Sequence, residues 1–244
     1  MNVVAVNGGP RKGKISKTAT MLEALLDGCR HAGANTEVIN LREKEVRACN
    51  GCYTCWTKTP GKCVQDDDMK EILEKYRRAD LHILATPLYF WGPTALMKNF
   101  IDRSMPLSHP FFLEKDGLLT HPPRDYTPAP KVILSVCGFP ELDHFEPLSH
   151  WFHFMAGRGL GSIVAEIYRP ASEFLPAPPF RQQYEEILAA TRQAGIELIT
   201  RGKVTKETLA VIQQDLMDKA AYIKMGNAYF QGEIDRWEAK RASK

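Results

Sequence analysis

Short apolar runs alternate with amphipathic helical segments along most of this chain, and this alternation restricts the fold more than any other feature. Residues 3–6, 36–41, 81–86, 132–136 and 162–168 read as strands. Apolar residues at helical spacing begin near residues 16, 66, 93 and 145. Strands separated by helices predict a parallel sheet covered on both faces. In such a doubly wound sheet, ligands bind beyond the carboxyl ends of the strands.

The composition excludes several classes of protein. Of the 244 residues, 44% are hydrophobic and 25% are charged, which is ordinary for a globular protein with a full core. The net charge of +3 is spread along the chain, so no basic block predicts binding to nucleic acid or to a membrane. The N-terminal segment lacks the basic start and the long apolar stretch of a signal peptide. We therefore expect a cytoplasmic protein.

The loop after the first predicted strand carries groups that suit a phosphate. Its residues are Gly8, Gly9, Pro10, Arg11, Lys12, Gly13, Lys14, Ile15, Ser16, Lys17 and Thr18. Free backbone N–H groups at a helix start, a guanidinium and two hydroxyls favour a phosphate monoester. The loop matches neither the dinucleotide-binding nor the triphosphate-binding glycine motif. An ordinary flexible turn, with Ser16 as a plain helix cap, is an equally good interpretation.

Three aromatic residues follow the third predicted strand in direct succession. The run is Thr86-Pro87-Leu88-Tyr89-Phe90-Trp91-Gly92-Pro93. Aromatic rings and exposed backbone amides at the end of a strand suit a flat heterocycle. The alternative is an aromatic plug in the core, but the flanking prolines and glycine favour a loop.

Four of the six cysteines fall within fifteen residues, in the pattern CxxCxxC followed by a fourth cysteine eight positions later. They are Cys49, Cys52, Cys55 and Cys63. Thiols at this spacing surround one iron–sulfur cluster in bacterial ferredoxins, whereas structural zinc sites usually pair two separate knuckles. The pattern favours electron transfer. A [4Fe–4S] centre, reduced thiols without metal, zinc and a disulfide all remain open.

Taken in order, these motifs resemble the NAD(P)H-dependent FMN reductases with a flavodoxin-like fold. With the four cysteines, the chain is most similar to the iron–sulfur flavoprotein branch, over about residues 1–168. The resemblance implies an α/β fold: a flavodoxin-like, doubly wound, five-stranded parallel sheet in three α/β/α layers, with extra C-terminal helices. We expect an FMN-binding domain over residues 1–169. Residues 170–244 would form a proline-rich linker and a helical extension, packed on the same domain or on a partner subunit.

The resemblance also implies which residues bind cofactors. The FMN phosphate would be held by Gly9, Pro10, Arg11, Ser16, Lys17 and Thr18. The isoalloxazine would be lined by Pro87, Leu88, Tyr89, Phe90, Trp91 and Gly92, and its other edge closed by Cys137, Gly138 and Phe139. A [4Fe–4S] cluster would be ligated by Cys49, Cys52, Cys55 and Cys63. Two positions depart from the family: Gly9 replaces a common serine, and Lys17 replaces a frequent asparagine.

On this resemblance we expect an oxidoreductase that passes electrons from NADH or NADPH through bound FMN, with the cluster as a second carrier. The acceptor would be a quinone, a nitro compound, a flavin or a protein. The flavin performs the redox chemistry, so no side chain is nominated as catalytic. The alternatives are an electron-transfer flavoprotein without a small-molecule substrate and a thiol-based redox sensor. A homodimer or homotetramer is expected.

Three further segments have structural interpretations. Cys29 lies on the apolar face of a predicted helix and is expected in the core. The acidic run Asp66-Asp67-Asp68 reads as the start of a helix. Near the C-terminus, Thr205 is expected to cap a helix whose apolar stripe comprises Leu209, Ile212, Leu216, Ala220 and Ile223.

Overall fold

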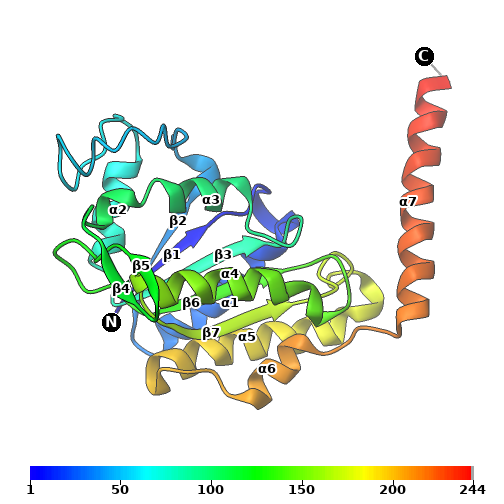
Figure 1. Ribbon diagram of the computed structural model, residues 1–244. Helices are drawn as coiled ribbons and strands as arrows, with labels where there is room; N and C mark the ends of the chain where they lie inside the picture. Colours follow the sequence, from blue (N-terminus) through cyan, green and yellow to red (C-terminus); the bar gives the residue numbers. More distant parts are fainter. Residues whose placement is uncertain (243–244) are drawn as a thin grey trace.

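The computed structural model describes residues 1–242 and confirms the predicted fold class (Figure 1). One five-stranded sheet has the order β2-β1-β3-β6-β7, and every neighbouring pair is parallel. Its strands are β1 (Asn2–Asn7), β2 (Asn35–Asn40), β3 (Leu81–Pro87), β6 (Lys131–Val136) and β7 (Ile163–Arg169). This is the flavodoxin-like order, in which the strand sequence reverses direction between β1 and β3.

Helices cover both faces of the sheet. On one face lie α1 (Lys17–His31) and α5 (Arg181–Arg201), with α6 (Lys206–Gln213) against α5 and β7. The other face is covered by α2 (Met69–Arg77), α3 (Ala95–Asp102) and α4 (Glu146–Met155). Alternate residues of each strand enter opposite cores: Val3 and Ala5 pack on the α1 side, while Val4 and Val6 pack on the α2 side. The result is the predicted three-layer arrangement.

Two glycines allow α1 and α5 to pack closely. A Cβ atom on Gly28 would lie 1.8 Å from the carbonyl oxygen of Arg192, and one on Gly195 would lie 2.0 Å from that of Leu25. No side chain fits at either position, so the two helix backbones touch directly. This contact holds α5, which follows the proline-rich segment, against the same core as α1.

Two elements lie outside the sheet and its helical layers. A hairpin of β4 (Leu113–Lys115) and β5 (Leu118–Thr120) occupies the insertion between α3 and β6. The last helix, α7 (Lys219–Ala242), extends away from the body, as the red helix in Figure 1 shows. Tyr229, Phe230 and Trp237 of α7 are all at least half exposed. Within residues 1–242, no helix has both the length and the apolar character needed to cross a membrane.

The prediction of one continuous C-terminal apolar stripe is wrong. Thr205 does cap α6, but the helix stops before the stripe is complete, and Ile223 lies on α7 with 53% of its surface exposed. The buried guanidinium of Arg169 donates to the carbonyl oxygens of Ile212 and Gln214, both at 2.7 Å. These oxygens would accept the next hydrogen bonds of a continuing helix, so the chain turns instead.

Candidate functional site

Three loops meet at the carboxyl edge of the sheet, where β1, β3 and β6 end. The N–H of Gly8 donates to the carbonyl oxygen of Ala85 at 2.8 Å, and the N–H of Leu88 donates to that of Val136 at 2.9 Å. The hydroxyl of Thr94 donates to the carbonyl oxygen of Gly8 at 2.7 Å. The loops therefore enclose a cleft at the point where the strand order reverses, which is where this fold binds ligands.

The cleft brings together most of the residues that the sequence marked for a cofactor. Those lining it are Gly9, Pro10, Arg11, Ser16, Lys17, Thr18, Pro87, Leu88, Tyr89 and Gly138. The lining also includes Val136, Ser172 and Glu173. Ser172 and Glu173 follow β7, where no motif pointed to a function. Phe90, Trp91, Gly92, Cys137 and Phe139 do not line this cleft.

The loop after β1 forms a cradle for an anion. Ser16 caps α1 by accepting a hydrogen bond from the N–H of Ala19 at 3.2 Å, and both Ser16 and Thr18 are buried. A Cβ atom on Gly9 would lie 3.0 Å from Asn7 Oδ1 and 3.6 Å from both Ser16 Oγ and Thr18 Cβ. Gly9 thus leaves open the space beside these groups, and the amino end of α1 attracts negative charge into it. A phosphate group fits this cradle.

Arg11 borders the cleft in an ion pair with Glu173. Its Nη1 lies 2.7 Å and 3.0 Å from the two carboxylate oxygens, and the side chains are 49% and 47% exposed. An ion pair this exposed contributes little to stability. The guanidinium can therefore exchange the carboxylate for another anion in the cleft.

The aromatic run forms a tight turn at the edge of the cleft. Phe90 and Trp91 have φ angles of 47° and 58°, in the left-handed region, and Tyr89 and Gly92 exchange two backbone hydrogen bonds of 3.0 Å. Tyr89 and Trp91 are about half exposed and Phe90 is 97% exposed, so the interpretation as a core plug is wrong. Trp91 donates from its indole nitrogen to Nδ1 of His144 at 3.0 Å.

The loop after β6 presents its backbone to the cleft. The buried thiol of Cys137 accepts a hydrogen bond from the N–H of Phe139 at 3.3 Å, and burial raises the pKa of this thiol. The carbonyl oxygen of Cys137 accepts from the hydroxyl of Ser172 at 2.9 Å. That of Gly138 accepts from the hydroxyl of Tyr222, so α7 supports this loop.

A larger cavity of about 980 Å³ adjoins the cleft and shares Arg11, Gly138 and Glu173 with it. The first turns of α7 form one wall of this cavity. Aromatic rings lining it belong to Phe139, Phe174, Tyr222, Tyr229 and Phe230. Two ion pairs also line it, Lys219 with Glu141 and Arg11 with Glu173, and the aromatic rings suit the stacking of an aromatic base.

The four clustered cysteines lie on the loop between β2 and α2. Cys49 and Cys52 are exposed, Cys55 is buried and Cys63 is half-buried. Burial raises the pKa of the Cys55 thiol, and the charges of Cys63, Cys52 and Cys49 raise it further. The four sulfurs are therefore close enough to interact electrostatically. Cys29 is buried in the α1 core, as predicted.

The cysteine loop has the donors for a metal cluster, but its described thiols do not converge on a common point. All six cysteines are free of disulfides. Among residues 1–242, no three His, Cys, Asp or Glu side chains converge as a metal site. Four thiols on one loop nevertheless supply the donor set that an iron–sulfur cluster requires.

A buried ion pair joins the cysteine loop to the end of α3. Arg103 donates to the two carboxylate oxygens of Asp67 at 2.7 Å and 2.9 Å, and the two side chains are 1% and 0% exposed. Arg103 also donates to the carbonyl oxygen of Arg47 at 2.6 Å and to the sulfur of Cys63 at 3.5 Å. A guanidinium beside a thiol stabilises the negative charge of a thiolate-ligated cluster. The donor set and this second shell fit such a cluster.

Asp67 was predicted to lie at the start of a helix, and in the structure it also anchors the cysteine loop. Burial opposes ionisation of this carboxyl, but hydrogen bonds from Arg103 and from the N–H groups of Arg47 and Met69 outweigh burial and lower its pKa. Only the bond to Met69 belongs to the start of α2. The other bonds hold the cysteine loop.

Comparison with known proteins matches the N-terminal part of the chain to one family. Residues 1–117 match the family described as NADPH-dependent FMN reductase. An iron–sulfur flavoprotein of Archaeoglobus fulgidus is 42% identical over 110 residues, which are 45% of this chain and 48% of that protein. An iron–sulfur flavoprotein of Methanocaldococcus jannaschii is 40% identical over 107 residues, 44% of this chain and 53% of that protein. The chain thus spans about half the length of the curated relatives it matches.

Solved structures show the same fold at low sequence identity. An NAD(P)H:quinone oxidoreductase from Methanothermobacter marburgensis superposes with a TM-score of 0.58 at 21% identity, covering 81% of this chain and 96% of its own. An FMN-dependent NADH-azoreductase from Bacillus anthracis, in complex with FMN, gives 0.61 at 15% identity, covering 82% and 99%. At these identities the likeness establishes the fold alone.

Proposed function

Residues 1–117 match the NADPH-dependent FMN reductase family, and on this basis we propose that the chain is a flavin-dependent oxidoreductase. It takes electrons from NAD(P)H and passes them to a separate acceptor. FMN, when bound, supplies the redox chemistry by accepting hydride and releasing electrons singly or in pairs. The observation that carries the proposal is the convergence of three strand-end loops on one cleft that contains an anion cradle.

The residues of the cradle bind the FMN phosphate. Ser16 and Thr18 supply hydroxyls, Gly9 leaves the necessary space, and the amino end of α1 supplies backbone donors. Arg11 turns from Glu173 to the phosphate, and Lys17 adds a second positive charge at the cleft. These groups position the cofactor, and none of them transfers a proton.

The other two loops hold the ring system of FMN. Pro87, Leu88 and Tyr89 line the cleft on one side, and Phe90, Trp91 and Gly92 complete the turn beside it. Gly138 also lines the cleft, and Ser172 and Tyr222 hold the loop of Cys137, Gly138 and Phe139 through the carbonyl oxygens of Cys137 and Gly138. Backbone amides in these loops orient and tune the ring.

The cavity beside α7 is the proposed site of NAD(P)H. Lys219, which pairs with Glu141, provides a cation for its phosphates, and the aromatic side chains provide stacking surfaces. The exposed aromatic turn at Tyr89, Phe90 and Trp91 favours a flat acceptor, such as a quinone, an aromatic nitro compound or a free flavin, over a protein.

We assign Cys49, Cys52, Cys55 and Cys63 as the ligands of a [4Fe–4S] cluster, which transfers electrons one at a time. The donor set, the contact between Arg103 and Cys63, and relatives named iron–sulfur flavoproteins support the assignment. Those names also favour a second candidate, an electron-transfer protein without a small-molecule substrate.

A thiol-based sensor is the remaining candidate, and one cysteine favours it. Cys52 is exposed, and hydrogen bonds from Thr54 lower the pKa of its thiol. A cluster-free protein with a reactive Cys52 would have this function.

The arrangement of subunits is also proposed. Residues 1–169 form the FMN-binding domain, and residues 170–244 form an extension whose last helix contacts a partner subunit in a homodimer or homotetramer. The exposed apolar side chains of α7 support this arrangement.

The test begins with anaerobically purified full-length protein. We expect flavin absorption bands, stoichiometric iron and acid-labile sulfide, and oxidation of NADH or NADPH that depends on a quinone. Arg11→Met removes a charged hydrogen bond to the phosphate and weakens FMN binding by about 10-fold to 100-fold. Lys12→Met, at an exposed neighbouring position, leaves FMN binding unchanged. Absence of flavin after reconstitution with FMN contradicts the proposal, whereas flavin without NAD(P)H oxidation favours the electron-transfer protein.

A further inference from the structure

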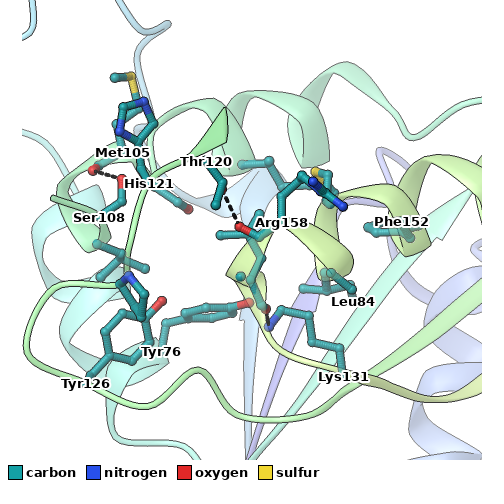
Figure 2. A pocket seen from close by; sticks show the side chains of 18 of the residues that line it. Tyr76, Leu84, Met105, Ser108, Thr120, His121, Tyr126, Lys131, Phe152 and Arg158 are labelled. Carbon is teal, nitrogen blue, oxygen red and sulfur yellow. Dashed lines mark hydrogen bonds between the residues drawn. The ribbon is translucent and has the colours of Figure 1, made fainter. Parts of the chain in front are cut away.

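A cavity of about 330 Å³, shown in Figure 2, is separate from both the cofactor cleft and the cavity beside α7. It lies at the opposite end of the sheet from the cleft. Lys131 and Ile163, the first residues of β6 and β7, line it, whereas the cleft lies beyond the last residue of β6. A strand of this length separates the two sites by about 16 Å. This cavity is therefore not part of the proposed flavin site.

The walls of this cavity are mainly apolar. They consist of Leu84, Phe100, Ile101, Leu107, Phe152, Met155 and Ile163. The hairpin and the cysteine loop close one side through His121 and Trp56, whose rings lie 4.5 Å apart. An apolar pocket with a few polar groups is the usual form of a small-molecule site.

Lys131 places a buried positive charge on the floor of the cavity. It is 8% exposed, and its Nζ donates to the carbonyl oxygens of Ala129, at 3.1 Å, and Leu160. An ammonium has three donors, so one donor is left without a protein acceptor. Burial alone lowers the pKa of Lys131, to about 8, and no carboxylate compensates it. The ammonium form still predominates at neutral pH.

Two tyrosine hydroxyls lie at the same end of the cavity, as Figure 2 shows for Tyr76, Tyr126 and Lys131. Tyr76 is 6% exposed, and its ring stacks on that of His82 at 3.5 Å. His82 is the strand partner of Lys131, which places the tyrosine and the lysine close together. Tyr76 and Tyr126 both line the cavity together with Lys131, and no aspartate or glutamate among residues 1–242 lines it. The polar end of the cavity therefore offers several hydrogen-bond donors and no carboxylate.

We propose that this cavity binds a small aromatic carboxylate, with its carboxylate on Lys131, Tyr76 and Tyr126 and its rings between Leu84, Phe100 and Phe152. A carboxylate supplies two acceptor oxygens for these donors and the negative charge that the lining of the cavity lacks. A dry cavity of about 150 Å³ holds one benzene ring, so about twice that volume holds two fused rings. Naphthoate is therefore a suitable probe.

The test is calorimetric titration of the full-length, FMN-reconstituted protein with 2-naphthoate. We expect one binding site, and at least tenfold weaker binding of the neutral 2-naphthalenemethanol and of octanoate. Tyr76→Phe removes a single oxygen and weakens binding by about 10-fold or more, as the loss of a hydrogen bond to a charged group implies. Lys131→Met has at least the same effect. Lys70→Met, at an exposed position on α2, leaves the affinity unchanged.

Several results would overturn the proposal. These are no heat of binding at millimolar 2-naphthoate, equal affinities for the carboxylate and the alcohol, or unchanged affinity in Tyr76→Phe. Tighter binding of octanoate refutes the aromatic part, and displacement of 2-naphthoate by excess FMN or NADPH assigns the probe to the cleft. If Lys131→Met does not fold, the affinity of Tyr76→Phe for 2-naphthoate alone tests the proposal. The flavin spectrum stays unchanged in both variants, so failure here is separable from failure of the proposed oxidoreductase function.

Discussion

Replacing Arg103 with methionine tests how the cysteine loop is held in place. The substitution keeps an apolar side chain but removes the bonds to Asp67, Arg47 and Cys63. It leaves a carboxylate, 0% exposed, with two backbone donors and a longer ion pair, 3.7 Å, to the half-exposed side chain of Arg47. Removing one partner of a buried ion pair costs about 3–5 kcal/mol, because the remaining charge stays buried and unpaired. We expect Arg103→Met to destabilise the protein by this amount.

Urea unfolding, followed by circular dichroism under anaerobic conditions, measures the effect. With a slope of about 2 kcal/mol per molar urea, a loss of 4 kcal/mol lowers the midpoint by about 2 M. The double variant Arg103→Met/Asp67→Asn removes the unpaired charge as well, so it should recover at least half of the loss. Arg181→Met is the matched control, because its ion pair with Glu185 is mostly exposed and contributes less than about 1 kcal/mol.

The same variants test the role of Arg103 beside Cys63. Iron content per chain should fall in Arg103→Met and stay unchanged in Arg181→Met. A destabilisation below about 1 kcal/mol, equal to the control, would refute the argument that the pair is buried and uncompensated. A double variant as unstable as the single one would refute the attribution to the Asp67 charge.

Three further predictions concern the core and the site. Gly28→Ala places a methyl group against the carbonyl oxygen of Arg192, so the free energy of unfolding in urea should fall by more than about 3 kcal/mol. Gly232→Ala is the control: Gly232 has open space around it, so this change should raise the free energy of unfolding by about 0.5–1 kcal/mol. Thr94→Val keeps the shape of a buried residue but loses its hydrogen bond to Gly8. Fluorescence titration should therefore show weaker FMN binding, and urea unfolding should show a free energy of unfolding lower by about 1–3 kcal/mol. The pKa of Lys131, lowered from 10.5 to about 8, makes the folded state release a proton that the unfolded state keeps. Wild-type stability should therefore rise, relative to Lys131→Met, by up to about 3 kcal/mol between pH 8 and pH 10.5, and parallel curves for the two proteins would contradict this.

Much of the fold could be predicted from local patterns of apolar and polar residues in the sequence. Strands were predicted because short apolar runs suit a sheet buried on both faces, and helices because apolar residues recur at helical spacing. Ser16 and Thr205 cap helices as expected, because a cap depends only on neighbouring backbone groups. The C-terminal stripe failed where a distant residue, Arg169, ended α6.

By itself, the sequence determined the strand and helix order, and with it the edge at which the loops after β1, β3 and β6 meet. Parallel strands gather their following loops at one edge, so motifs such as Gly9 to Thr18 could be assigned to a site from order alone. Only the tertiary structure decided the pairs Arg11–Glu173 and Arg103–Asp67, and the unpaired charge of Lys131. Those depend on which side chains from distant segments share a desolvated space, and no local spacing of residues encodes that proximity.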